Sequence, residues 1–85
     1  MPHFYFSTSI DGRAGSQSDP LDLPDTRAAW MEATVACGEI MKEIDGDFSA
    51  PGELRLDVSD ETRQPLFSLR VNSEVHQDRV KRDLQ

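Results

Sequence analysis

The sequence lacks most of the residues that mark specialised classes of protein. Its 85 residues include one cysteine, Cys37, which cannot form a disulfide within the chain and is typical of a packed thiol in a reducing compartment. No apolar run approaches the roughly 20 residues that cross a bilayer, and the N-terminus lacks the segments of a secretory signal. We therefore predict a cytoplasmic protein with no membrane partner.

Basic residues are also scarce. Nine Lys and Arg stand against sixteen Asp and Glu, which gives a formal net charge of -7. Residues 74–85 carry three acids and three bases, so the whole excess lies in residues 1–73. An acidic body repels phosphate backbones, which predicts no direct nucleic-acid binding. The excess favours solubility, and the second interpretation is a surface for a basic protein partner.

Patterns that carry catalytic or metal chemistry are missing. His3 and His76 have no partner at metal-ligand spacing, and the serines and glycines form neither a nucleophile elbow nor a phosphate loop. The alternating acids of residues 45–49 begin like a calcium loop, but Ala50 replaces the sharp-turn glycine and Leu56 the terminal carboxylate. We expect a non-enzymatic protein with no catalytic, cofactor or metal residues.

One segment, residues 24–44, has the periodicity of a helix. Asp25 or Thr26 can accept hydrogen bonds from its first free N–H groups. At about 100° per residue, one face collects small and aliphatic side chains, with Trp30 and Met41 flanking it. This face comprises Ala29, Ala33, Ala36, Cys37, Ile40 and Ile44. It predicts a stripe that packs on the core, and a helix-dimer seam is the alternative.

Several segments around the helix predict strands. Residues 3–9 are apolar on both faces, which favours a central strand, and residues 21–23 can return beside them as a short edge strand. Residues 54–58 and 66–71 alternate with period two on either side of a hairpin turn. Residues 11–20 are rich in Gly, Ser, Asp and Pro, which predicts a turn followed by a mobile loop.

The order of these elements is strand, strand, helix, strand, strand. It predicts an α+β fold, a small two-layer domain in which one main amphipathic helix packs on an antiparallel sheet of three or four strands. We assign residues 1–72 to this single domain. Residues 73–85 are expected to form a charged C-terminal tail, frayed or folded as a short helix.

Four short motifs follow one another in a distinctive order. They are Met-Pro-x-Phe-Tyr-Phe at 1–6, Asp-Gly at 11–12, Leu-x-Leu-Pro-Asp at 21–25 before the alanine-rich helix, and Asp-Glu at 60–61 between the last two strands. Together they resemble a family of short bacterial proteins that form a domain family of unknown function. The resemblance implies a small cytoplasmic α+β domain and brings no catalytic or ligand residues.

The chain is also similar, more loosely, to the antitoxin half of bacterial toxin–antitoxin pairs with a degenerate nuclease-like fold. In those proteins too, a hairpin and Leu-Pro-Asp precede an alanine-rich helix. The third strand that they have before the helix is not predicted here. The similarity implies the alternative function, an antitoxin-like or regulatory acidic protein that binds a basic partner.

Two exposed surfaces are the candidate interaction sites. Met31, Val35 and Gly38 follow one another at i, i+4 and i+7 on the helix side opposite the core stripe. On the exposed face of the sheet we expect a polar patch formed by Tyr5, Arg55, Asp57, Ser68 and Arg70. The leading prediction is a protein-interaction module that binds a protein partner or itself, as a homodimer, through the outer helix line or a sheet edge.

Overall fold

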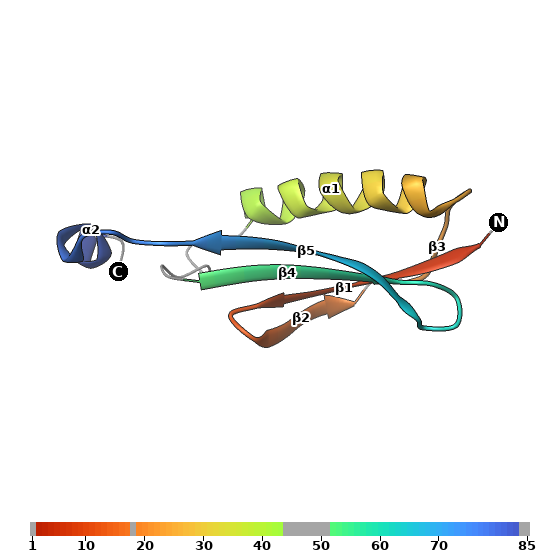
Figure 1. The fold of residues 1–85 in the computed structure, drawn as a ribbon, viewed down its shortest axis with the longest axis horizontal. Coiled ribbons are helices and arrows are strands. Elements are labelled where there is room, and N and C mark those ends of the chain that lie inside the picture. The colour runs from red at the N-terminus through yellow and green to blue at the C-terminus, as the bar shows by residue number, and fades with distance from the viewer. Residues whose placement is uncertain (1, 18, 44–51, 84–85) are drawn as a thin grey trace.

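The computed structural model describes residues 2–17, 19–43 and 52–83. Its elements are β1 (His3–Ile10), β2 (Arg13–Gln17), β3 (Leu21–Asp22), α1 (Thr26–Glu43), β4 (Gly52–Ser59), β5 (Pro65–Ser73) and α2 (Asp78–Asp83). Figure 1 shows α1 lying along one face of a twisted sheet. All strand pairs are antiparallel. The predicted α+β class, with one main helix on an antiparallel sheet, is confirmed.

The sheet has the order β2-β1-β4-β5, and β3 pairs with the start of β1. β1 therefore has neighbours along both edges, as its apolar character on both faces predicted. The register places Phe6 opposite Val58, and Val58 opposite Phe67, in one apolar row beneath α1. Because side chains alternate along each strand, the intervening residues of the same strands face away from the helix.

The prediction of a loop throughout residues 11–20 is wrong, because Arg13–Gln17 form β2. Asp11 and Gly12 have φ angles of 54° and 80°, the positive values that favour a two-residue hairpin turn. The N–H of Asp11 donates to the carbonyl of Glu53, and the Asp11 carboxylate accepts from the N–H of Glu53, both at 2.8 Å. β2 thus supplies a third strand before the helix, which the sequence interpretation had missed.

The core lies between α1 and the sheet. Ala29 and Ala33 are fully buried and Cys37 is 9% exposed, so the small residues of α1 let the helix approach the strands closely. The facing side chains, which are also buried, are Phe4, Phe6, Leu54, Leu56 and Val58. The predicted inner face of the helix is confirmed for Ala29, Ala33, Cys37 and Ile40, and Ala36 is half-buried at its margin. Ile44 lies outside the described residues.

The start of α1 is fixed by Asp25. Its Oδ1 accepts a hydrogen bond from the N–H of Ala28 at 2.8 Å, so Asp25 provides the N-terminal cap. At the other end of the chain, β5 continues past the helix and leads to α2, which lies apart from α1 (Figure 1). Neither of the two helices in the described ranges has the length and apolar composition that crossing a membrane requires.

Candidate functional site

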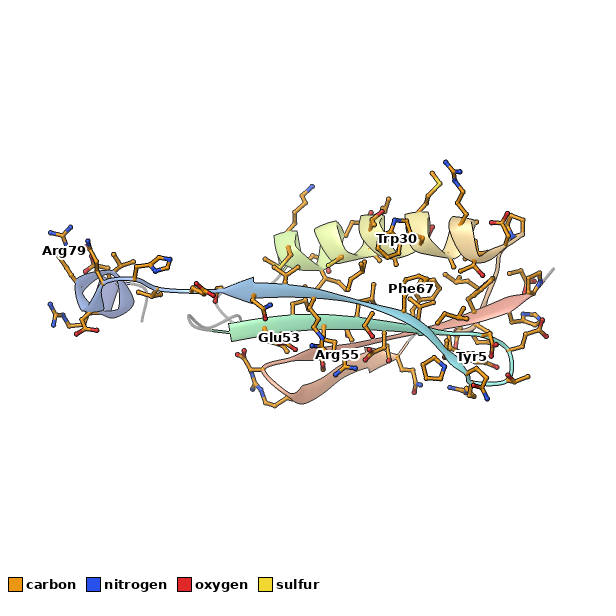
Figure 2. The ribbon with its side chains drawn as sticks, viewed as in Figure 1. Tyr5, Trp30, Glu53, Arg55, Phe67 and Arg79 are labelled. Atoms are coloured by element: carbon orange, nitrogen blue, oxygen red, sulfur yellow. The ribbon has the colours of Figure 1, made fainter. Side chains whose placement is uncertain are left out.

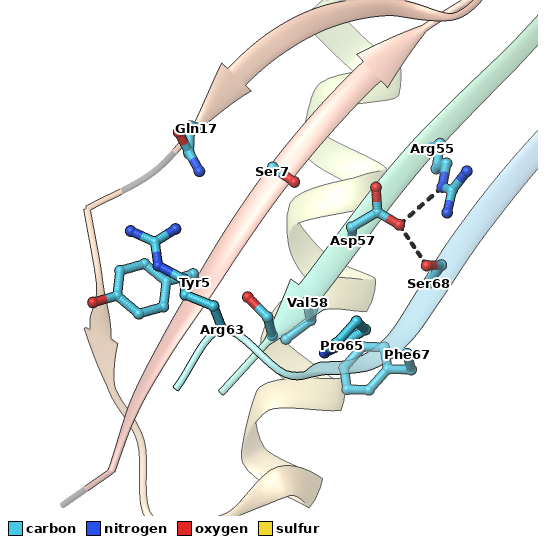
Figure 3. Close-up of a pocket in the computed structure, with 11 residues that line it drawn as sticks. Tyr5, Ser7, Gln17, Arg55, Asp57, Val58, Arg63, Pro65, Phe67 and Ser68 are labelled. Atoms are coloured by element: carbon cyan, nitrogen blue, oxygen red, sulfur yellow. Dashed lines mark hydrogen bonds and ion pairs between the residues drawn. The ribbon is translucent and has the colours of Figure 1, made fainter. Parts of the chain in front are cut away.

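The face of the sheet opposite α1 carries a cluster centred on Asp57. In the strand register, Asp57 lies between Ser7 of β1 and Ser68 of β5. Its Oδ1 accepts hydrogen bonds from Nε of Arg55 at 2.8 Å and from the Ser68 hydroxyl at 2.5 Å (Figure 3). Both are hydrogen bonds to a charged acceptor, which are the short and strong kind. The cluster therefore links β4 to β5 across their exposed face.

The surroundings of Asp57 keep it ionised. Partial burial raises the pKa of Asp57, but hydrogen bonds from Ser68 and Arg55 and the positive charges of Arg55 and Arg70 outweigh it, so this pKa lies below the ordinary value of 3.8. A carboxylate held in this way accepts protons poorly at neutral pH. Asp57 consequently orients its neighbours and is a poor candidate for a general base.

The turn between β4 and β5 places a second cation on this face. The Arg63 guanidinium lies 3.7 Å from the centroid of the Tyr5 ring, a cation–π contact. Arg63 has a φ of 67°, which is unusual for a residue with a side chain. The Asp60 carboxylate holds the turn by accepting hydrogen bonds from the N–H and hydroxyl of Thr62 and from the N–H of Gln64, at 2.8–2.9 Å.

These two features line a single pocket with a cavity volume of about 360 Å³. Figure 3 shows the Arg63–Tyr5 stack at one end and the Arg55–Asp57–Ser68 cluster at the other. The rest of the lining includes the hydroxyls of Ser7 and Ser59 and the amide of Gln17. The pocket is open to solvent and rich in hydrogen-bonding groups, which suits a polar ligand.

The second hollow surface is an apolar groove between α1 and β5, with a volume of about 330 Å³. It is lined by Thr34, Cys37, Gly38, Met41, Leu69, Arg70 and Val71. Near it, the ring of Trp30 packs edge-on against Phe67 with a centroid distance of 5.1 Å, and the Trp30 side chain remains 46% exposed (Figure 2). This groove borders the strand edge of β5 that has no neighbour in the part of the chain that the structure describes.

The residues singled out from the sequence are distributed over three places. Tyr5 and Arg55 line the polar pocket together, as expected for one exposed sheet face. Arg70 lies opposite Arg55 in the register but lines the apolar groove, where Gly38 also lies. Met31 and Val35 are 59% and 56% exposed on the outside of α1. The outer helix line is therefore exposed, and its role as an interface stays a prediction.

Arg63 is the functional candidate that the sequence interpretation missed. No local pattern predicts a positive φ at an arginine, because this conformation depends on the hydrogen bonds of Asp60 with the rest of the turn. The available signals were the alternation of side chains along β1 and the position of the turn between the last two strands. Together they indicate that residues 60–64 lie near Tyr5. Propensity alone could not locate the guanidinium above the ring.

The described part of the chain gathers no metal-ligating side chains around either histidine. Nδ1 of His3 contacts the Asp22 carboxylate across the β1–β3 pair, and Nε2 of His76 is 3.9 Å from Oε2 of the exposed Glu74. Within residues 2–17, 19–43 and 52–83, no three His, Cys, Asp or Glu side chains gather in a way that could hold a metal ion. The acids of residues 45–49, considered above for calcium, lie outside the described residues.

The fold and these surfaces define a small α+β domain with one helix on an antiparallel sheet. The model of a family described as a domain of unknown function (DUF6894) matches residues 3–72, and the chain belongs to this family. The resemblance to a domain family of unknown function is thereby confirmed. Comparisons with curated proteins and with solved structures gave no match.

Proposed function

We propose that this domain is a non-enzymatic protein-interaction module that forms a homodimer through β5. The observation that supports the proposal is the off-centre position of α1. The helix packs on β4 and β5, at the side of the sheet where the outer edge of β5 has no neighbour among the described residues (Figure 1). The groove between α1 and that edge is apolar. A second copy of the chain, related to the first by a two-fold axis, would cover both the groove and the edge of β5.

The dimensions of helices and strands support this arrangement. Neighbouring strands lie about 4.8 Å apart, and packed helices lie about 8–10 Å apart. If two copies join through β5, the sheet continues as β4-β5-β5-β4, and each helix covers two strands. The two copies of α1 then lie side by side at a normal packing distance over one continuous sheet.

The edge of β5 is poorly protected against such pairing. β5 spans nine residues and pairs only with β4 within the described ranges. A long unpaired edge normally carries prolines, bulges or covering elements that prevent association. Its one proline, Pro65, stands at the start, which leaves the rest of the strand able to donate and accept backbone hydrogen bonds.

The flank of α1 that faces this edge carries no acidic residue, and its one charged residue, Arg27, lies in the first turn of the helix. Trp30, Thr34, Gly38 and Met41 follow one another along it, whereas the helical period places Glu32, Glu39 and Glu43 on the opposite flank. The Thr34 hydroxyl donates to the carbonyl of Met31 at 2.8 Å, so it needs no other partner. A close contact with a second helix here buries no carboxylate, and the exposed Arg27 side chain, near the helix end, keeps its charge in water.

Gly38 supports a close contact in particular. A glycine inside a helix costs about 1 kcal/mol relative to alanine. No atom lies within 4 Å of the position that a Cβ would take at Gly38, so packing within one chain does not require a glycine. Approach of a second backbone accounts for this residue, since small residues allow helices to pack closely.

Light scattering coupled to size exclusion, over a range of protein concentrations, tests the proposal. The wild type is expected to be a dimer at high concentration, and Met41→Glu a monomer, because a carboxylate would be buried in the groove. Val35→Glu is the control: it places a carboxylate on the same helix, at a position 56% exposed and farther around the helix from the groove, and should remain dimeric. A monomeric wild type at every concentration contradicts the proposal, and dissociation by Val35→Glu alone would place the interface on the outer helix line.

A second candidate, an antitoxin-like protein that binds a basic partner, is favoured by β2. This strand supplies the third strand before the helix whose absence had set the chain apart from such antitoxins. The glutamate flank of α1 offers the acidic surface. Co-expression with the products of the neighbouring genes would yield a complex that dissociates at high salt. Failure of every such product to form one counts against this function. The cytoplasmic location likewise remains a prediction.

A further inference from the structure

We propose that the pocket lined by Tyr5, Arg63, Arg55 and Asp57 binds a small polar oxyanion, either a phosphate ester or a hydroxycarboxylate. The pocket lies on the sheet face opposite α1 (Figures 2 and 3). It would remain open in a dimer formed through β5. Anion binding at this pocket therefore does not depend on whether the chain forms a dimer.

Positive charge is scarce in residues 1–73, and a third of the bases there line the pocket. The three acids and three bases of residues 74–85 leave thirteen acids and six bases in residues 1–73. Two of those six bases, Arg55 and Arg63, line the pocket, and among the described residues Asp57 is the only acidic one in the lining. Since Asp57 is already hydrogen-bonded by Arg55 and Ser68, the lining has a net positive charge that attracts anions.

Arg63 is the group placed to bind the anion. One face of its guanidinium rests on Tyr5, and stacking of this kind leaves the N–H groups at the edge of the plane free to donate. No carboxylate within the described ranges lies within ion-pair distance of Arg63. Its φ of 67° is maintained by the Asp60 hydrogen bonds, so the turn holds the guanidinium on this face of the sheet.

A second hollow next to the pocket can hold the hydroxyl-bearing part of the ligand, beside the group that carries the negative charge. Ser7, Gln17 and Asp57 line both the pocket and an adjoining hollow of about 370 Å³ along β1 and the β1–β2 hairpin. The walls of that hollow add Ser9, which shares the face of Ser7 on β1, and the backbone at Gly12 and Gly15. Hydroxyl and amide groups of this density match a ligand that carries hydroxyls, and they disfavour an apolar one.

The test is an NMR titration of the isotope-labelled full chain with glycerol phosphate, with malate, and with glycerol as the neutral control. We expect saturable shifts of the Ser7, Gln17 and Arg63 amide signals with at least one of the two anions, and none with glycerol. The anion that binds distinguishes phosphate esters from hydroxycarboxylates. Added salt should weaken binding, because the attraction is electrostatic.

Two variants separate binding from folding. Arg63→Gly removes the cation, and glycine adopts a positive φ freely, so the turn should persist while affinity falls at least about tenfold. Arg27→Gln removes an arginine from α1, outside the pocket, and should bind as the wild type does. The proposal is overturned if neither anion gives saturable shifts, or if Arg63→Gly binds with the affinity of the wild type.

Discussion

Two glycines, Gly15 and Gly38, stand in opposite surroundings. A Cβ added at Gly15 would lie 2.7 Å from Oγ1 of Thr8 and 3.1 Å from the Thr8 carbonyl oxygen, whereas at Gly38 it meets no atom within 4 Å. We predict that Gly15→Ala lowers the free energy of unfolding by about 1–3 kcal/mol, since β2 must move away from β1.

The matched substitution Gly38→Ala should raise the free energy of unfolding by up to about 1 kcal/mol at concentrations where the chain is monomeric, because alanine favours the helix. Urea unfolding of both variants and the wild type measures the difference. Equal effects of the two substitutions would contradict this account of β2.

Asp60 gives the hairpin turn a sensitivity to acid. Hydrogen bonds from the Thr62 hydroxyl, and then from the Gln64 and Thr62 N–H groups, lower the pKa of Asp60 below its ordinary value of 3.8. A lowered pKa in the folded state means that the unfolded chain binds the proton more tightly. The stability that Asp60 contributes is therefore complete above about pH 5 and is lost as the pH falls through the lowered pKa.

Asp60→Asn should consequently reduce the loss of stability between about pH 5 and pH 2. Urea unfolding of the wild type and of this variant across that range measures the effect, and Asp19→Asn is the control from outside the turn. An acid response in Asp60→Asn as steep as that of the wild type would exclude the turn as its source.

The exposed sheet face could be predicted only in part. The period-two alternation of β4 and β5 places Arg55 and Asp57 opposite the core, and it does so from the sequence alone. The register brings Ser68 beside Asp57, and that depends on where the hairpin turns. The position of Arg63 depends on a backbone conformation that only the completed turn imposes.

At the scale of elements, the cap of α1 has a measurable contribution. Asp25→Ala removes the acceptor for the Ala28 N–H and should lower the free energy of unfolding by about 1 kcal/mol. Asp25→Ser, which also caps, should restore most of the loss. Asp19→Ala makes the same change of charge in the preceding segment, and a loss as large in that control would assign the effect to charge.

The helix and four strand segments could be predicted because each has a periodic or aromatic pattern of its own. β2 could not, since Arg13–Gln17 has no bulky apolar residue and its strand character comes from pairing with β1. The Asp11-Gly12 pair carried the available signal, because these two residues adopt the positive φ angles of a tight hairpin. The composition of residues 11–20 predicted a loop, but the Asp11-Gly12 turn makes residues 13–17 return as the second strand of a hairpin.

At the scale of the whole molecule, α2 contributes little to the body of the fold. Val80 is 39% exposed, and the structure extends over 50 × 20 × 19 Å, with α2 beyond the end of β5 (Figure 1). We predict that removing residues 74–85 leaves the urea midpoint and slope unchanged, since little apolar surface is lost. Circular dichroism during unfolding measures both. A lower midpoint would reveal a docking contact for α2.

Cys37 has a further consequence for experiments on the intact chain. Its thiol is the only one in the sequence, and it lies 9% exposed at the floor of the groove between α1 and β5. This small exposure slows alkylation, which becomes faster whenever α1 moves away from the sheet, so the rate records how accessible the floor of the groove is. If β5 pairs as proposed, the rate will fall as protein concentration rises, and the natural thiol will report assembly without an added label.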